Sequence, residues 1–271
     1  MENNNSKKEM SFLGHLEELR WRLVKSAIAI LIMAIILFYF TNPVIEHVYL
    51  AMSKNNFPTY QFFCKLSSLL NLEGFLCAKD IPIQIQSIEM TKQFSTNMYF
   101  AIVGGIVIVF PFIFHQFWSF LKPGLKENEV TVTRGVVFFA SILFFLGVLF
   151  GYYLISPLCV QFFGGYKLSS EIQNNFTISS YMSMITTSTF FSGLFFELPV
   201  VVFILSKLGL VSSKMLKKFR KHALVGILLL SAIITPPDVI SQVLVSIPIL
   251  ILYEIGIGVA KLVEKKKEKL N

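Results

Sequence analysis

Six apolar runs dominate this sequence, and they constrain its fold more than any other feature. The first four are close to the length of about 20 residues that a helix needs to cross a hydrocarbon layer of ~30 Å. Only 15% of the residues are charged, whereas a soluble domain carries about a quarter. The sequence therefore predicts an all-α membrane protein with a membrane domain of residues 23–260. We expect its six transmembrane helices at residues 23–40, 96–117, 136–155, 184–205, 223–234 and 243–259.

The last two of these runs are the shortest. About 12 apolar residues, as in 223–234, rise only about 18 Å as a helix. Such a helix is either buried away from lipid or forms a short span that thins the bilayer around it. The few residues between the two runs, 235–241, require a tight antiparallel hairpin. We expect a short fifth and a short sixth span, and therefore a locally thinned membrane.

Lysine and arginine residues orient the chain. Nineteen of the 24 fall in one set of connections and only five in the other. The five are Lys54, Lys65, Lys79, Lys92 and Lys167. The positive-inside rule places the richer set in the cytoplasm, which predicts a multi-pass protein of the bacterial inner membrane with both termini cytoplasmic. Residues 1–22 are then a cytoplasmic amphipathic segment, 41–93 a large external loop and 261–271 a basic tail. The same distribution explains the net charge of +8 without nucleic acid as a partner.

The loop 41–93 carries three prolines and several amphipathic stretches, so we expect a folded cap rather than a linker. Cys64 and Cys77 lie in this loop, 13 positions apart, on a side of the membrane where a disulfide can persist. The spacing leaves two readings equally open, a Cys64–Cys77 bridge or two thiols.

Enzyme and metal signatures are missing from the sequence. It contains no CxxC pair, no HExxH and no P-loop, and its four histidines are scattered along the chain. We therefore expect a protein that is not an enzyme and that binds no metal and no cofactor.

Two acidic residues lie in polar segments on the predicted cytoplasmic side. Glu18 belongs to the amphipathic segment, and Arg22 follows it at the spacing of a helical ion pair. Anchoring at the membrane surface would explain this segment equally simply. Glu129 follows the helix-breaking Pro123-Gly124, where it either caps the next helix or contacts a ligand.

Glu197 falls inside the fourth apolar run, where an ionised carboxylate is costly and an acid is a functional candidate. Thr186, Thr189 and Gly193 share its helical stripe. Pro199 has no N–H to donate to the carbonyl four residues earlier, which predicts a free acceptor and a kink. The alternative is a neutral Glu197 that is hydrogen-bonded across a helix interface.

A short motif separates the last two apolar runs. Pro236, Pro237 and Asp238 form a rigid turn on the external side, and Gln242 follows one helical turn later. Asp238 stands where it can cap the next helix, so the residues by themselves favour a structural role.

Four motifs occur in a characteristic order. They are His15-Leu-Glu-Glu-Leu-Arg20-Trp-Arg22, Lys122-Pro-Gly-Leu followed by Glu129, Phe196-Glu197-Leu-Pro199, and Thr235-Pro-Pro-Asp238-Val-Ile-Ser-Gln242. Together they resemble the TatC family, the multispanning core subunit of the twin-arginine protein translocase. The resemblance extends over residues 12–261.

The resemblance implies the signal-peptide receptor of a machine that exports folded proteins with the proton-motive force. Glu18 and Glu129 would bind the Arg-Arg pair of a signal peptide, because carboxylates accept paired hydrogen bonds from guanidinium groups. Arg20 would orient Glu18 or the loop, and Glu197 would meet a partner helix or the apolar part of the signal peptide. The implied partners are TatA/TatB-type single-span subunits in an oligomeric complex. A proton-coupled secondary transporter of a small solute, with Glu197 as its coupling site, is the alternative.

Overall fold

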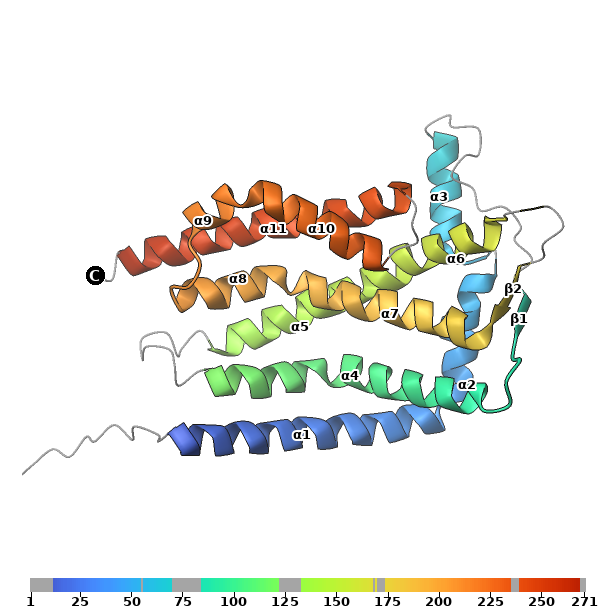
Figure 1. The fold of residues 1–271 in the computed structure, drawn as a ribbon, viewed down its shortest axis with the longest axis horizontal. Helices are drawn as coiled ribbons and strands as arrows, with labels where there is room; N and C mark the ends of the chain where they lie inside the picture. The colour runs from blue at the N-terminus through green and yellow to red at the C-terminus, as the bar shows by residue number, and fades with distance from the viewer. Residues whose placement is uncertain are drawn as a thin grey trace, which may run out of the picture.

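The protein is a bundle of long helices that lie side by side (Figure 1). The computed structural model describes residues 12–54, 56–69, 84–121, 133–167, 169, 174–234 and 239–268. The bundle is formed by α1 (Phe12–Tyr39), α4 (Lys92–Leu121), α5 (Thr133–Phe150), α7 (Ile178–Phe196), α8 (Leu198–Lys207), α10 (Arg220–Ile234) and α11 (Val239–Glu268). The start of α1 and the end of α11 lie at the same end of the bundle.

Within the described residues, five helical segments are long and apolar enough to cross a membrane. They are Gly14–Tyr39, Lys92–Leu121, Gly135–Gly165, Ile178–Lys207 and Val245–Glu268. The predicted fifth span corresponds to α10, whose 15 residues rise about 22 Å. Because this is shorter than the hydrocarbon layer, six spans stay a prediction.

The sixth helix is longer than predicted. We expected a short apolar run over residues 243–259, but α11 has 30 residues. Its last turns are held by polar contacts with the connection after α8: Glu264 Oε1 accepts from the Ser213 N–H at 2.7 Å, and Lys267 Nζ donates to the Lys207 carbonyl at 2.7 Å. Residues 261–268 of the predicted tail therefore continue the helix. These tertiary contacts stabilise helical turns that the hydropathy of the sequence did not predict.

The predicted amphipathic segment and first span form a single helix. α1 is 28 residues long, or about 42 Å, and it runs straight in Figure 1. The segment is therefore not a separate surface helix. No proline interrupts the sequence between residues 12 and 39, so nothing ends the hydrogen-bond ladder where the polar segment meets the apolar one.

The fourth span is broken at Glu197. α7 ends at Phe196 and α8 begins at Leu198, which confirms the predicted kink. The predicted free carbonyl is wrong, because the Phe195 carbonyl accepts a backbone hydrogen bond at this helix end. The chain compensates for Pro199 with a tighter turn, in which the Glu197 N–H donates to the Leu194 carbonyl at 3.1 Å.

The third span contains a wide helical turn. α5 continues through the π-helical turn η5 (Gly151–Ile155) into α6 (Ser156–Gly165). Glycines let this span approach α7 closely: a Cβ on Gly147 would lie 2.6 Å from the Ser192 carbonyl oxygen, and one on Gly151 would lie 2.8 Å from the Thr189 Cα. Small residues at such contacts are typical of packing between membrane helices.

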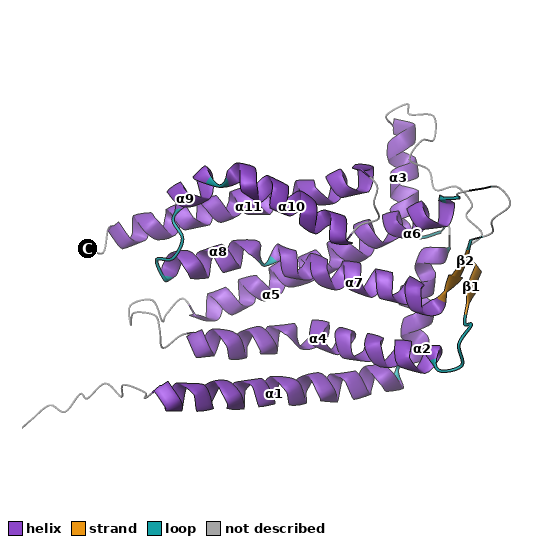
Figure 2. Ribbon diagram, viewed as in Figure 1, coloured by secondary structure: helices purple, strands orange, loops and turns teal. Residues whose placement is uncertain are grey.

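A helical cap covers the end of the bundle opposite the start of α1. It consists of α2 (Thr41–Val44), the π-helical turn η1 (Ile45–Tyr49), η2 (Leu50–Ser53), α3 (Pro58–Leu69) and the two strands β1 (Gln84–Gln86) and β2 (Asn175–Thr177). The strands pair in parallel, with Ile85 opposite Phe176 (Figure 2). Tyr49, Met52 and Phe57 anchor the cap in an apolar cluster with residues of α4, α6 and α7. Cys64 is disulfide-bonded, and its predicted partner Cys77 lies outside the described residues.

Candidate functional site

The Glu18 site lies at the end of the bundle where α1 begins, and we define it as Glu18, Arg22 and Gln116. Arg22 Nε donates to Glu18 Oε1 at 2.9 Å, and Arg22 Nη2 contacts the same oxygen. The predicted ion pair between these residues is thereby confirmed. Arg22 Nη1 reaches across to α4 and donates to Gln116 Oε1 at 3.2 Å. One guanidinium therefore links the carboxylate on α1 to an amide on α4.

The second carboxylate oxygen of Glu18, Oε2, differs from Oε1 in its surroundings. Oε2 is buried and has no hydrogen-bond partner among the described residues. A buried acceptor without a partner costs about 1–3 kcal/mol. The site thus contains one oxygen that is already bound to a guanidinium and a second that is available to another donor.

The surroundings of the Glu18 site keep α1 and α4 in register. The rings of His15 and Phe120 stack at 4.2 Å between centroids, with 15° between their planes. Further along the same pair of helices, a Cβ on Gly105 would lie 3.2 Å from the Ala34 backbone nitrogen. Because α1 packs against α4 at both places, the Glu18 site is held by two rigid helices rather than by a loop.

We expected Arg20 to orient Glu18 or the loop after α4; in the described residues Arg22 contacts Glu18, and the loop lies outside them, so that part stays a prediction. The Arg20 guanidinium lies over the Trp21 ring, 5.9 Å from the centroid, while Arg22 orients the Glu18 carboxylate. Local spacing revealed the Glu18–Arg22 pair, but nothing in the sequence pointed to Gln116, which is 94 positions from Arg22. Glu129 lies outside the described residues, so its expected role stays a prediction.

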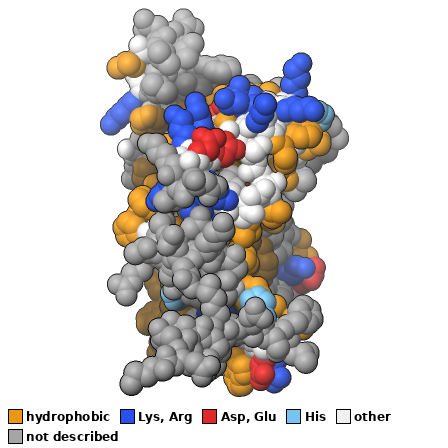
Figure 3. Space-filling view, turned by 90° about the vertical axis from the view of Figure 1, so that its left-hand side faces the viewer, with side chains coloured by type: hydrophobic (Ala, Val, Ile, Leu, Met, Phe, Trp, Pro, Cys, Tyr) orange, Lys and Arg blue, Asp and Glu red, His pale blue; other side chains and the backbone are white. Residues whose placement is uncertain are grey.

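Positive charge gathers at this end of the molecule (Figure 3). Exposed lysines and arginines of α9 (Ser213–Lys218), α10 and α11 account for much of it. They are Lys214, Lys217, Lys218, Arg220, Lys221, Lys261, Lys265 and Lys266. Arg220 also forms an ion pair with Glu254, with 2.6 Å between Nη2 and Oε2 and both side chains about half exposed.

Glu197 is a second site, deep in the bundle. Its side chain is 6% exposed, and neither carboxylate oxygen has a hydrogen-bond partner in the part of the chain that the structure describes. The predicted alternative, a Glu197 hydrogen-bonded across a helix interface, therefore finds no partner in these ranges. Burying a carboxyl group without a partner is unfavourable, so packing among the described residues does not explain this position.

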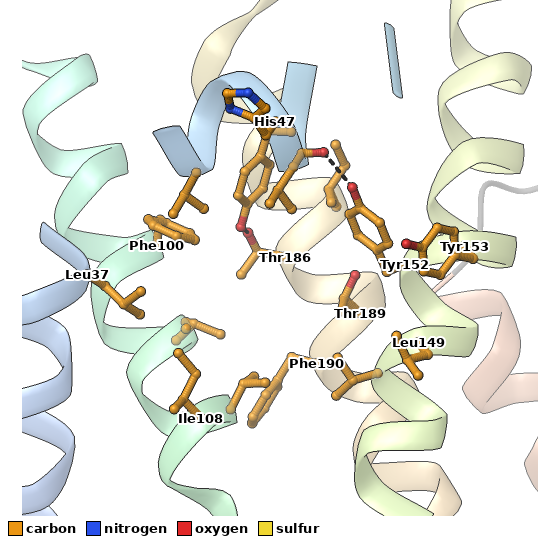
Figure 4. A pocket seen from close by; sticks show the side chains of 18 residues that line it. Leu37, His47, Phe100, Ile108, Leu149, Tyr152, Tyr153, Thr186, Thr189 and Phe190 are labelled. Carbon is orange, nitrogen blue, oxygen red and sulfur yellow. Dashed lines mark hydrogen bonds between the residues drawn. The ribbon is translucent and has the colours of Figure 1, made fainter. Parts of the chain in front are cut away.

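An apolar groove of about 530 Å³ opens between α1, α4, η5 and α7 (Figure 4). We call it the α4–α7 groove. Phe100 and Ile108 of α4 line it, and so does Phe190 of α7. Thr186 and Thr189 of α7 are also part of the lining, whereas Glu197 lies two turns further along the chain, beyond that lining. The polar stripe predicted on this helix is therefore divided between the groove and the packed interior.

The hydroxyl groups around the α4–α7 groove are largely bonded within the protein. Tyr49 Oη and Thr186 Oγ1 are 2.7 Å apart, and the Tyr152 hydroxyl donates to the Val48 carbonyl at 2.8 Å (Figure 4). These bonds connect the cap to α7 and η5. The surface that stays available in the groove is consequently apolar.

The hairpin between α10 and α11 contains the one residue of the external turn motif that can be placed. Gln242 Nε2 donates to the Leu228 carbonyl at 2.9 Å and so ties α11 to α10. Pro236, Pro237 and Asp238 lie outside the described residues. Within the described ranges, no three His, Cys, Asp or Glu side chains come together in a way that could hold a metal ion.

Comparison with known proteins identifies the family. The model of the family "Sec-independent protein translocase protein (TatC)" matches residues 14–248. The chain is 37% identical over 265 residues to the Sec-independent protein translocase protein TatC of Blattabacterium sp. subsp. Periplaneta americana (strain BPLAN), and the match covers 97% of this chain and 99% of that protein. It is 33% identical over 261 residues to TatCy of Bacillus subtilis (strain 168), with 96% and 92% covered.

A solved structure shares the fold. The crystal structure of the twin arginine translocase receptor TatC in DDM is similar to this chain with a TM-score of 0.71 and 30% sequence identity. The similarity covers 91% of this chain and 99% of that one. On the family match, the relatives and the shared helical membrane fold, this chain belongs to the Sec-independent protein translocase protein (TatC) family.

Proposed function

We propose that this chain is the signal-peptide-receptor core of a twin-arginine translocase, which exports folded proteins across the bacterial inner membrane with the proton-motive force. The observation that carries the proposal is the Glu18 site. Its carboxylate already binds a guanidinium, that of Arg22, and its second oxygen is buried with no partner among the residues that the structure describes. A site built this way suits a ligand that brings further guanidinium groups.

Arginine recognition follows from the chemistry of the site. A guanidinium presents several N–H donors in one plane and binds carboxylate oxygens in pairs, whereas a lysine ammonium is a compact point charge. Glu18 Oε2 gains a donor when such a ligand arrives, which relieves the cost of its unpartnered burial. We propose Glu129 as the second carboxylate for the Arg-Arg pair and Arg20, exposed beside Trp21, as a residue at the edge of the site.

The α4–α7 groove supplies the second half of the proposal. It is apolar, it is open to the side of the bundle, and its volume of about 530 Å³ suits a row of apolar side chains. We propose that it receives the apolar part of the signal peptide or the helix of a TatA/TatB-type subunit. Glu197 finds no hydrogen-bond partner among the described residues, which supports an oligomeric complex, because a donor on a partner helix would satisfy its carboxyl group.

The proposed orientation has both termini in the cytoplasm and six spans, with α10 as the short fifth. The start of α1 and the end of α11 lie at the same end of the bundle (Figure 1), which supports an even number of membrane crossings. The external turn of Pro236, Pro237 and Asp238 then joins α10 to α11. Gln242 contributes by bonding to the Leu228 carbonyl, so we propose a structural role for this motif.

Peptide binding tests the proposal directly. The full chain in nanodiscs is titrated with a labelled signal peptide that carries Arg-Arg, and with the same peptide carrying Lys-Lys. Loss of a charged hydrogen bond costs about 1.5–3 kcal/mol, so we expect Glu18→Gln to weaken Arg-Arg peptide binding about tenfold or more. Glu254→Gln is the matched control, since this acid also pairs with an arginine at the same end of the protein.

Two outcomes decide whether the assigned acids bind the signal peptide. Receptor function requires weaker binding in Glu18→Gln or Glu129→Gln, together with loss of export of an Arg-Arg reporter in a strain whose own core subunit is replaced by the variant. Unchanged affinity in both variants would rule out the assigned acids.

A proton-coupled secondary transporter is the second candidate, and the buried Glu197 carboxyl, which has no partner in the described part of the chain, favours it. That function predicts solute uptake by the purified chain alone in liposomes under a proton gradient, and loss of uptake in Glu197→Gln. The translocase predicts no uptake by the chain without its partner subunits.

A further inference from the structure

Helix α3 of the cap runs across the direction of the long helices and protrudes from the side of the bundle (Figure 1). Its first turn is fixed. The Thr59 hydroxyl donates to the Tyr153 carbonyl in η5, and the Tyr60 hydroxyl donates to the Met52 carbonyl at 3.1 Å. The ring of Phe57, just before the helix, stacks on Tyr153 with 5.9 Å between centroids. The protruding part of α3 therefore has a defined direction.

The side chains of α3 divide into three faces. Thr59, Tyr60 and Ser67 point into the protein and are buried. Phe62 and Leu69, which are seven residues apart and so lie on the same side of the helix, form an apolar stripe that is 63% and 81% exposed. An exposed apolar stripe on a helix that is already anchored calls for an apolar environment outside the chain.

Polar side chains flank this stripe on one side. Lys65 is exposed and, three residues after Phe62, lies about 60° around the helix from it. Gln61 and Ser68 lie beyond it in the same direction. The disulfide-bonded Cys64 lies on the side of the helix away from Phe62. This arrangement of apolar stripe, flanking cation and polar remainder is typical of a helix that lies in a membrane interface.

A groove of about 460 Å³ runs beneath α3. Pro58 and Phe62 form one wall, and Leu149 and Tyr153 of the third span form the other. Leu149 and Tyr153 are themselves 50% and 45% exposed on the outside of the bundle, where a membrane-spanning helix meets acyl chains. The groove is therefore continuous with the lipid-facing surface of the span.

We propose that this groove binds an acyl chain of an anionic phospholipid whose phosphate lies at Lys65. The lipid belongs to the leaflet at the end opposite Phe12 and Glu268, which is the outer leaflet in the proposed orientation. A lipid is the expected ligand because the groove is continuous with the lipid-facing surface of the third span. A negative headgroup is expected because Lys65 lies beside the apolar stripe, and a lysine can extend its ammonium group to the interface while its stem stays on apolar surface.

Quenching of a tryptophan by brominated lipid measures this binding. Phe62→Trp places the reporter in the groove, and Leu69→Trp is a second reporter on the same stripe. Each full-length variant is reconstituted in phosphatidylcholine vesicles that contain a small fraction of dibromo-phosphatidylglycerol or dibromo-phosphatidylcholine. The unsubstituted chain gives the background from Trp21 and Trp118, which belong to the other end of the bundle.

One lysine near an anionic surface contributes enough to change lipid affinity about fivefold. We expect dibromo-phosphatidylglycerol to quench the reporters with about fivefold higher apparent affinity than dibromo-phosphatidylcholine. Lys65→Gln, made in the reporter background, should abolish this preference. Lys92→Gln should retain it, because Lys92 starts α4 at the same end of the protein and is paired with Glu89, with 3.7 Å between Nζ and Oε2.

Two results would overturn the proposal. Equal quenching by the two brominated lipids would remove the role of Lys65, and no quenching by either would show that protein, such as a second copy of the chain, covers the stripe. Both leaflets of the vesicles contain the probe and no signal peptide is needed. The outcome is therefore independent of the receptor function and of the orientation proposed above.

Discussion

Replacing Arg22 with glutamine removes the guanidinium that already contacts Glu18. Arg22 Nε is 2.9 Å from Glu18 Oε1, and the two side chains are 24% and 25% exposed. A buried hydrogen bond to a charged group contributes about 1.5–3 kcal/mol, and an exposed ion pair about 0–1 kcal/mol. Because this pair is partly exposed, we take its contribution to the free energy as about 1 kcal/mol, which corresponds to a change in affinity of about fivefold.

An incoming arginine at Glu18 Oε2 shares the single carboxylate charge with Arg22, which holds Oε1. Removing Arg22 removes the repulsion between the two guanidinium groups and frees both oxygens for the ligand. We therefore expect Arg22→Gln to bind an Arg-Arg signal peptide about fivefold more tightly than the unchanged chain. Without peptide the variant should be less stable, because the half-buried Glu18 loses its guanidinium. Fluorescence anisotropy of a labelled peptide measures the affinity, and thermal unfolding in the same nanodiscs, with and without peptide, measures the stability.

Lys25→Gln is the control for net charge, since Lys25 is an exposed cation of the same helix. An equal gain in affinity in Lys25→Gln and Arg22→Gln would mean that long-range charge, and not the contact with Glu18, sets the effect. Weaker peptide binding by Arg22→Gln would refute the reasoning outright, because Arg22 would then position the carboxylate for the ligand instead of competing with it.

Three further predictions concern the rest of the bundle. Glu197→Leu removes a buried carboxyl that has no partner among the described residues. It should raise the unfolding free energy of the isolated chain by about 1 kcal/mol and impair export; a variant that exports normally would show that the acid is dispensable. Gly147→Ala should destabilise the chain by about 1–3 kcal/mol, because the new Cβ would lie 2.6 Å from a carbonyl oxygen of α7. Gly226→Ala, whose Cβ would meet nothing within 4 Å, should be neutral or stabilising in the same denaturation assay. The Ser213 N–H at the start of α9 donates to Glu264 at 2.7 Å. Glu264→Ala removes this bond, so the Ser213 amide should exchange its hydrogen about tenfold faster. An unchanged exchange rate would show that α11 does not hold this connection.

The parts of this fold that could be predicted are those that depend on neighbours in sequence. The long apolar runs marked the positions of four helices, since hydropathy over about 20 residues reports directly on a membrane span. The Glu18–Arg22 pair was readable from its spacing, as was the break near Glu197, because Pro199 affects the backbone only four residues away.

The remaining features depend on residues that are distant in the chain. Gln116 reaches Arg22 over 94 positions, and no local pattern distinguishes it from other polar residues near a helix end. The extension of α11 to Glu268 depends on contacts with Ser213 and Lys207, so a lysine-rich segment that reads as a tail becomes helix. Only the packed structure contains this information.

The break at Glu197 has a mechanical consequence. On one side of it, α7 is locked to α5 by glycine contacts. On the other side, α8 packs mainly on α11, where a Cβ on Gly256 would lie 3.3 Å from Val202 Cγ2. A single continuous helix would pass a tilt of α11 along its whole length. Two helices separated by a break at Glu197 can change their relative orientation instead. We therefore expect a partner that displaces α11 to move α8 more than α7, with the buried Glu197 carboxyl at the break between these two helices.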